Sequence, residues 1–307
     1  MRRTILRGVH ELAKRDERVV FIGSDISKRD LAAFAEEFPD RYIMEGVYEQ
    51  HVVGLAAGLA MSGKIPYINT IATFLTRRCY EQIVIDLCMH NQPVRLIGSG
   101  GGTVYAPLGG THLAIEDMAI LRCVPHMTVV ACSDAEEMER FLPTTLDYPG
   151  PIYIRLAKGG DNVVPHDGSP FVIGKAYLKR AGDDALLVGT GTTTLRCLEA
   201  AELLAQQGIE AAVLHAPTLK PFDHEALLAH AAPVRAVVSV EEGVKHGGLG
   251  SAVAECIAEA NFPAPKRFAR MAFPDAFLEH FGSQNEIMAR YGLTPEGIAQ
   301  RTAELLA

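Results

Sequence analysis

Residues 19–25 read VVFIGSD, four apolar residues followed by a turn. A short continuous apolar run that ends in Gly, Ser or Asp is typical of a strand buried on both faces. The preceding residues 5–14 have the apolar spacing of a helix. The same alternation continues, with strands predicted at 66–70, 94–98 and 128–131 and helices at 52–62, 74–89, 115–123 and 135–142, the last stopped by Pro143. The pattern predicts a mostly parallel sheet covered by helices on both faces.

A second unit follows a change in composition. Around residues 157–170 the pattern gives way to Gly, Asp and Pro, as in a linker. Strands are then predicted at 185–191, 211–215 and 234–240, with a helix at 193–207. We therefore expect an α/β fold of two doubly wound domains with largely parallel sheets, at 1–165 and 166–307, in keeping with a length of 307 residues.

Composition excludes several classes of function. The net charge is −8 and no basic cluster is present, which argues against a nucleic acid or an anionic membrane as partner. No apolar run is long enough for a membrane span and no signal-peptide core follows Met1, so we expect a cytoplasmic protein. The six cysteines are scattered and predicted to be reduced and mostly buried. Neither they nor the eleven histidines have the spacing of a metal site, so no metal is expected on this chain.

Glu49 lies in the segment GVYEQH, residues 46–51, where a helix is predicted to begin. A carboxylate in the first turn of a helix can cap free backbone N–H groups. It can also hold a proton for a bound heterocycle. Local features leave both interpretations open.

A glycine-rich segment, GSGGG at 98–102, leads to GGTH at 109–112. Its backbone N–H groups could cradle a phosphate. However, no Gly-Lys-[Ser/Thr] follows and no Gly-x-Gly-x-x-Gly fingerprint is present, which argues against nucleotide binding. His112 alone would be interpreted as a structural histidine, and it becomes a candidate only together with Glu49.

Several segments match a known family in order and spacing. Residues 46–50, 56–60, 73–77, 110–117 and 121–125 resemble the pyrimidine-binding domain of transketolase-like thiamine diphosphate enzymes, and residues 218–221, 240–250 and 291–294 resemble their C-terminal domain. The resemblance covers essentially the whole chain but only half of a transketolase. The Gly-Asp-Gly motif ending in Asn, with which the other half holds metal ion and diphosphate, is missing.

The resemblance therefore implies the second subunit of a split transketolase, which transfers a two-carbon ketol unit between sugars or sugar phosphates. It implies activity only with a partner chain that carries the diphosphate-binding domain and Mg²⁺ or Ca²⁺. Two copies of each chain are expected in a 2+2 heterotetramer. Two alternatives stay open: the beta subunit of a 2-oxoacid dehydrogenase first component, and a catalytically silent structural subunit.

The resemblance also implies a set of cofactor-binding residues. The matching glutamate, Glu49, hydrogen-bonds a ring nitrogen of the aminopyrimidine and favours the imino tautomer, whose nitrogen removes the thiazolium proton. Apolar surroundings would suit this role, because burial favours the protonated form of a carboxyl. Phe74, with Tyr80, is expected to give the pyrimidine an aromatic face. Asp25 matches an acidic position near the cofactor, with turn capping as the alternative. Arg77 replaces an aromatic residue of some members and resembles deoxyxylulose phosphate synthase there.

On the substrate side, His112 matches the histidine that stabilises the oxygen on which charge develops. Lys158, and Arg3 or its neighbour at position 2, match cations that bind substrate phosphate. Gly100 and Leu108 stand where sugar-phosphate transketolases carry a histidine and an aspartate. Fewer polar groups predict an altered donor or acceptor, such as a branched or deoxygenated sugar. Comparable turnover of xylulose 5-phosphate and ribose 5-phosphate by the assembled enzyme would contradict this.

Overall fold

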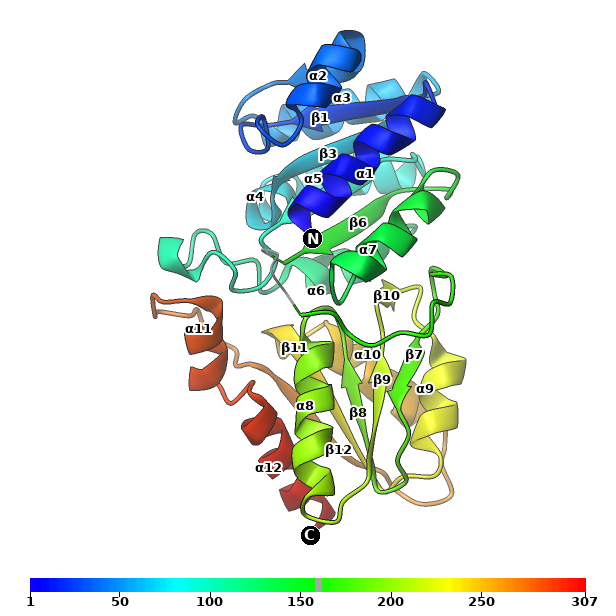
Figure 1. Ribbon diagram of the computed structural model, residues 1–307, viewed down its shortest axis with the longest axis vertical. Coiled ribbons are helices and arrows are strands. Elements are labelled where there is room, and N and C mark those ends of the chain that lie inside the picture. The colour runs from blue at the N-terminus through cyan, green and yellow to red at the C-terminus, as the bar shows by residue number, and fades with distance from the viewer. Residues whose placement is uncertain (158–161) are drawn as a thin grey trace.

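The computed structural model describes residues 1–157 and 162–307, which form two α/β units along the long axis of the molecule (Figure 1). The sheet of the first unit has the order β10-β5-β6-β4-β3-β1-β2. Its strands are β1 (Val19–Gly23), β2 (Tyr42–Met44), β3 (Ile65–Ile71), β4 (Arg95–Ser99), β5 (Thr128–Ala131), β6 (Ile152–Leu156) and β10 (Thr218–Lys220). Neighbours pair in parallel except β10, which is antiparallel to β5. The predicted parallel sheet is confirmed.

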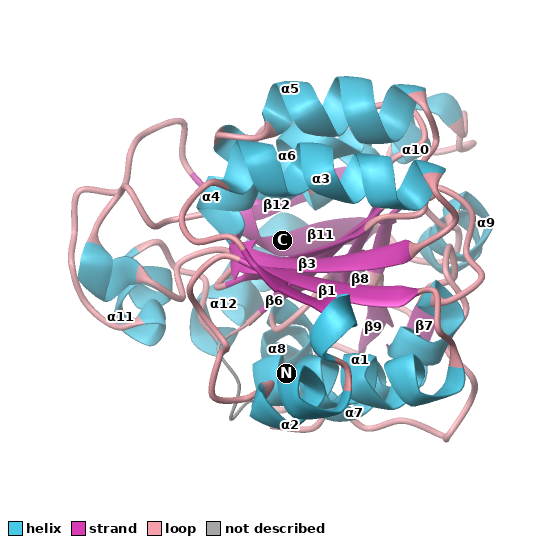
Figure 2. Cartoon of the chain, turned by 90° about the horizontal axis from the view of Figure 1, so that it is seen from above, coloured by secondary structure: helices cyan, strands magenta, loops and turns pink. Residues whose placement is uncertain are grey.

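Helices cover both faces of this sheet (Figure 2). They are α1 (Arg2–Arg15), α2 (Ala32–Glu37), α3 (Glu49–Met61), α4 (Ala72–Arg77), α5 (Tyr80–Gln82), α6 (Asp117–Arg122) and α7 (Ala135–Phe141). In β1, Val20 and Ile22 pack in the core beneath α3 to α6, whereas Val19 and Phe21 pack beneath α1, α2 and α7. Alternate residues of a strand point to opposite faces, which is why a doubly covered strand must be apolar throughout.

Two predicted helices differ from the structure. The helix expected at 74–89 is divided into α4, α5 and a π-helical turn at Ile83–Met89. The helix α7 ends at Phe141, but Pro143 does not stop helical structure altogether. A 3-10 helix follows at Leu142–Thr145, with the proline in its first turn. A proline at that position needs no N–H partner.

The second unit has a five-stranded sheet of order β12-β11-β8-β9-β7. Its strands are β7 (Tyr177–Arg180), β8 (Ala185–Gly189), β9 (Ala211–His215), β11 (Ala236–Val244) and β12 (Arg267–Phe273), and its helices are α8 (Thr193–Ala205), α9 (His224–Ala231), α10 (Leu249–Glu259), α11 (Gln284–Arg290) and α12 (Pro295–Leu306). Only β7 is antiparallel to its neighbour. The core of α8 and α12 lies on one face, and α9 and α10 join the core of the first unit on the other. The doubly wound architecture is thus confirmed for both units.

The two units are tied together through the chain and through side chains. Strand β10 follows β9 in the chain, yet it extends the sheet of the first unit.

All six cysteines are free thiols and five are buried, as expected. In the described part of the chain, no helix combines the length and the apolar character that crossing a bilayer requires.

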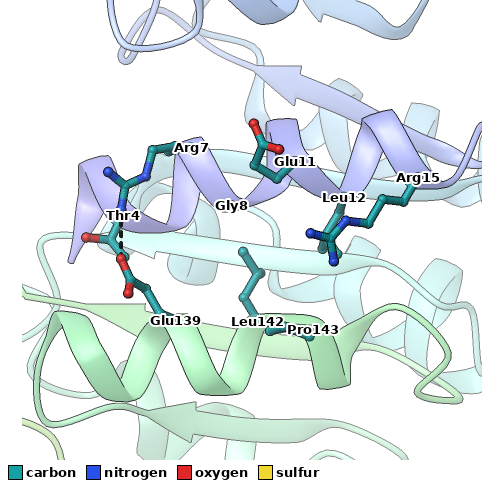
Figure 3. Close-up of a pocket in the computed structure, with 9 residues that line it drawn as sticks. All are labelled: Thr4, Arg7, Gly8, Glu11, Leu12, Arg15, Glu139, Leu142 and Pro143. Atoms are coloured by element: carbon teal, nitrogen blue, oxygen red, sulfur yellow. Dashed lines mark hydrogen bonds and ion pairs between the residues drawn. The ribbon is translucent and has the colours of Figure 1, made fainter.

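A groove of about 310 Å³ runs between α1 and α7 (Figure 3). Arg7 and Glu139 form an ion pair across it at 2.7 Å. Helix α1 comes close to the 3-10 helix after α7 because Gly8 faces Leu142, where an added Cβ would lie 2.3 Å from Leu142 Cδ2. The groove lies on the face of the sheet opposite α3, so it is a packing feature and not part of the site described below.

A buried contact between a carboxylate and an imidazole joins the units at α7 and β9. His215 Nε2 lies 2.8 Å from Glu137 Oε2, and the two side chains are 0% and 3% exposed. Burial alone would raise the pKa of Glu137, but the charge and hydrogen bond of His215 and a hydrogen bond from the backbone N–H of Ser133 outweigh it and lower the pKa to about 2. The carboxylate therefore stays ionised in the folded chain at pH values where the unfolded chain takes up a proton.

We expect the free energy of unfolding to fall as the pH drops below about 4.5, the ordinary pKa of a glutamate, towards 2. A carboxyl whose pKa is lowered on folding contributes stability above its unfolded pKa and loses it as the pH falls through the folded value. Urea titrations at several acidic pH values should show a smaller loss for Glu137→Gln than for the native chain. Glu139→Gln, on the same helix but half exposed, is the control and should keep the native pH dependence. An equal loss in Glu137→Gln would contradict this prediction.

Candidate active site

Four of the predicted site residues follow strands of the first sheet at their carboxyl ends: Asp25 follows β1, Glu49 follows β2, Phe74 follows β3 and His112 lies in the loop after β4. Parallel strands end at a common edge, where the following loops and helix starts can meet. Ser24 follows β1 and donates a hydrogen bond to Thr70 Oγ1 of β3 at 2.9 Å. The backbone N–H of Gly46 bonds the carbonyl of Ser24 at 3.0 Å, which brings the start of α3 to this edge.

Glu49 is the first residue of α3 and its side chain is only 2% exposed. Arg78 Nη1 donates a hydrogen bond to Glu49 Oε2 at 2.9 Å. Among the described residues it is the one hydrogen-bond partner of this carboxylate, so the side chain does not act as a helix cap. The expected apolar surround is wrong, because a guanidinium lies against the carboxylate.

Phe74 and His112 continue this cluster. The Arg78 guanidinium carbon lies 4.1 Å from the centre of the Phe74 ring. On α4, Phe74 also meets the His112 ring edge-on, with 5.0 Å between ring centres. The structure therefore connects Glu49, Phe74 and His112 through a series of contacts. Arg78 contacts both Glu49 and Phe74, and Phe74 contacts His112. An apolar ring beside a buried carboxylate is a surface that a flat heterocycle with a ring N–H can occupy.

Arg77 turns away from Glu49 and towards the His112 loop. It pairs with Glu116 and donates from Nη2 to the carbonyl of Leu113 at 2.9 Å. The hydrogen bond to Glu116 is the main reason that the pKa of Arg77 is raised. Tyr80 also turns to α6, with its hydroxyl 3.4 Å from the carbonyl of Ile120. Their described contacts are thus structural, and their roles at the cofactor stay predictions.

The remaining predicted residues lie at varying distances from the cluster. Asp25 is exposed beyond β1, and its Oδ1 lies 3.1 Å from Ser24 Oγ. The Arg3 side chain is 87% exposed and pairs with Asp30 at 3.5 Å, and no described contact joins it to the cluster. Lys158 lies outside the described residues. Gly100 has a φ of +76°, and an added Cβ would lie 2.1 Å from Tyr105, so no histidine fits there without movement.

Sequence reasoning missed the roles of Arg78 and Glu116. Arg78 directly follows the matching segment 73–77, and Glu116 lies inside the matching segment 110–117. Two adjacent arginines cannot be assigned to different partners from spacing alone. In the part of the chain that the structure describes, no group of three or more His, Cys, Asp or Glu is placed to hold a metal ion.

Two family models match the chain. The transketolase pyrimidine-binding domain matches residues 1–160 and the transketolase C-terminal domain matches residues 174–298. Among curated relatives, a 1-deoxy-D-xylulose-5-phosphate synthase of Symbiobacterium thermophilum is 42% identical over 96% of this chain. The chain spans only 45% of that synthase.

Other relatives match along nearly their full length. The 6-deoxy-6-sulfo-D-fructose transketolase subunit SqwH of Clostridium sp. is 38% identical, with 96% of this chain and 91% of the relative covered. An apulose-4-phosphate transketolase subunit of Phocaeicola vulgatus is 35% identical, with 96% and 94% covered. A solved structure described as a split gene transketolase, inactive beta4 tetramer, superposes with a TM-score of 0.89 at 32% identity, covering 99% of this chain and 97% of that one. The chain therefore belongs to the transketolase family, of which it carries the pyrimidine-binding and C-terminal domains.

Proposed function

We propose that this chain is the C-terminal subunit of a split thiamine diphosphate-dependent transketolase, active together with a partner that carries the diphosphate and metal site. The observation that carries the proposal is length. The chain covers 91–94% of two relatives named as transketolase subunits but 45% of a synthase that is a longer chain. The given sequence is thus comparable in length to these subunits and spans less than half of the synthase.

The cluster at the sheet edge fits the pyrimidine end of the cofactor. Thiamine diphosphate, when bound, supplies a nucleophilic carbon that adds to a ketone and takes up the charge of bond cleavage. Glu49 shares a proton with a pyrimidine ring nitrogen. Because Arg78 engages Oε2, Oε1 is the oxygen left for that nitrogen among the described contacts. Phe74 offers its ring for stacking, which contributes about 0.5–1.5 kcal/mol beyond burial.

His112 acts on the substrate side of this cluster. Its ring stands edge-on to Phe74 at 5.0 Å, so a group held on Phe74 lies within reach of the imidazole. Thr111 Oγ1 lies 2.9 Å from Nδ1, and a bond to one ring nitrogen selects the tautomer and orientation of the other. Nε2 is then the atom that hydrogen-bonds the substrate oxygen, where negative charge develops in the transition state.

The substrate class proposed is a sugar or sugar phosphate that departs from the usual pentose and hexose phosphates. Gly100 and the half-exposed Leu108 offer no polar side chain where the family carries histidine and aspartate. Two relatives are named for unusual sugars, a 6-deoxy-6-sulfo-fructose and apulose 4-phosphate. Both names agree with an altered donor or acceptor.

Exposed apolar side chains support the proposed 2+2 assembly. Those that lie on or next to α3 and the π-helical turn are Val47, Tyr48, Met61, Ile85 and Met89. Gly54 and Gly58 of α3 have open space where a side chain would lie. Apolar side chains are common in the buried part of protein interfaces, and small residues let another element approach closely. Figure 2 shows α3 and α5 on the same side of the first sheet.

Calorimetric titration of thiamine diphosphate with Mg²⁺ tests the proposal. We expect no tight binding to this chain alone, because the diphosphate and metal contacts belong to the partner. A mixture with the product of the neighbouring open reading frame should bind the cofactor and show ketol transfer. Tight binding by the lone chain would contradict the split-enzyme assignment.

A second candidate follows from the 42% identity to the 1-deoxy-D-xylulose-5-phosphate synthase. Arg77 occupies the place at which the sequence resembles that synthase. The assembled complex distinguishes the two candidates by its product, since formation of 1-deoxy-D-xylulose 5-phosphate would favour the synthase activity over ketol transfer.

A further inference from the structure

The loop that carries His112 is closed at its base. The backbone N–H of Gly102 bonds the carbonyl of Ala114 and the N–H of Ala114 bonds the carbonyl of Gly102, both at 2.9 Å. The segment between them has little regular structure beyond one 3-10 turn at Ala106–Leu108. A loop of this kind keeps its shape only if its ends are held.

The first end is held by a carboxylate of the second unit. Glu242, two residues before the end of β11, is 4% exposed and contacts the first unit. Its Oε1 accepts hydrogen bonds from the backbone N–H of Thr103 at 2.7 Å and from Thr103 Oγ1 at 2.6 Å. Gln284 Nε2 donates to Glu242 Oε2 at 2.8 Å from the other side. Hydrogen bonds to an ionised acceptor are among the strong ones in proteins.

The second end is held by the same strand. The backbone N–H of Val244 bonds the carbonyl of Ile115 at 2.8 Å. Arg155 Nη2 donates to the carbonyl of Ala114 at 3.0 Å and to the carbonyl of Glu242 at 2.7 Å, so one guanidinium joins loop and strand. Both ends of the loop are therefore fastened to β11.

The loop is shaped to admit the carboxylate. Gly102 has a φ of +65°, which disfavours other residues. A Cβ added there would also lie 2.4 Å from Glu242 Cδ. Neighbouring Glu241 points to the other side of β11 and caps α10 through the N–H groups of Leu249 and Gly250. Only one of two adjacent buried glutamates thus serves the loop.

We propose that the C-terminal domain positions His112, and that Glu242 is the positioning residue. The proposal rests on the proposed function, in which His112 faces the substrate. By fixing Thr103, Glu242 restricts where the loop can place the imidazole. Misplacement of a reacting group by about 1 Å can cost on the order of 10²-fold in rate.

The test compares three variants in the complex assembled with the partner chain. Glu242→Ala should lower kcat by about 10- to 100-fold while the KM for cofactor stays near the native value. Glu242→Gln should recover most of the activity, because an amide oxygen can still accept from Thr103 and the amide of Gln284 can turn to match. Glu241→Ala is the matched control, equally buried on the same strand, and should lower thermal stability without lowering kcat.

Hydrogen exchange of the peptide spanning 103–113, measured on the full chain, gives a readout independent of activity. Glu242→Ala should accelerate its exchange, and Glu241→Ala should not. Equal losses of kcat in both alanine variants, in step with their loss of stability, would overturn the proposal. If His112→Asn leaves kcat unchanged, the proposed role of His112 fails. If His112→Asn lowers kcat and Glu242→Ala does not, only the positioning role fails.

Discussion

Glu49→Gln is expected to lower kcat of the assembled complex by at least ~10²-fold, the size of the proton-transfer contribution that a positioned carboxyl supplies. Glutamine keeps the shape of the side chain but cannot share a proton with a pyrimidine ring nitrogen. The carboxylate is 2% exposed, so bulk water cannot replace it as the group that exchanges a proton with the ring nitrogen. Steady-state rates with saturating thiamine diphosphate and Mg²⁺ measure the loss.

Glu45→Gln is the matched control for this change. Glu45 lies four residues earlier and is exposed, with His51 at 3.5 Å as its partner. It should retain native activity. Full activity of Glu49→Gln would assign the chain to the alternative class, a catalytically silent structural subunit, and would remove the argument for a cofactor-activating site.

Arg155→Met is expected to lower the free energy of unfolding by about 3–5 kcal/mol, the range for removing one partner of a buried ion pair. Arg155 Nε lies 3.0 Å from Asp117 Oδ2, and the two side chains are 9% and 1% exposed. Tyr153 donates to the same oxygen at 2.6 Å. Burial raises the pKa of Asp117 even though Arg155 opposes the rise. Methionine leaves this carboxyl buried without its cation.

Urea denaturation followed by circular dichroism and by tyrosine fluorescence measures this loss. Arg18→Met is the control, since the exposed Arg18 pairs with Asp16 at 2.6 Å on the surface and such pairs contribute no more than about 1 kcal/mol. Similar losses in the two variants would contradict the importance assigned to the buried pair.

Much of the fold follows from apolar periodicity. The strands predicted at 19–22, 128–131, 185–191 and 211–215 match β1, β5, β8 and β9 to within two residues. They are recognisable because a strand covered on both faces is apolar at nearly every position. The single helix predicted at 74–89 was divided in the structure. Apolar periodicity does not reveal that the first helix ends at Arg77 or that a π-helical turn follows at Ile83–Met89. Tertiary packing overrides local preference there.

The candidate site was only partly accessible from sequence. Glu49, Phe74 and His112 follow from motif order, and the structure places them together. The expected apolar surround of Glu49 was wrong, because nothing in the order of residues says that Arg78 folds back onto the carboxylate while Arg77 turns to Glu116. Adjacent residues at a helix end point in directions that depend on where the helix stops.

The sequence by itself determined the two parallel sheets, the family and the absence of the diphosphate motif, because each depends on residue types in a fixed order along the chain. Tertiary structure alone decided the surroundings of Glu49 and the support of the His112 loop. Glu242 and Thr103 are 139 residues apart in the chain and 2.7 Å apart in space. Such a pair forms because the two units dock against each other, and docking geometry is set by the packing of whole units and not by any local pattern.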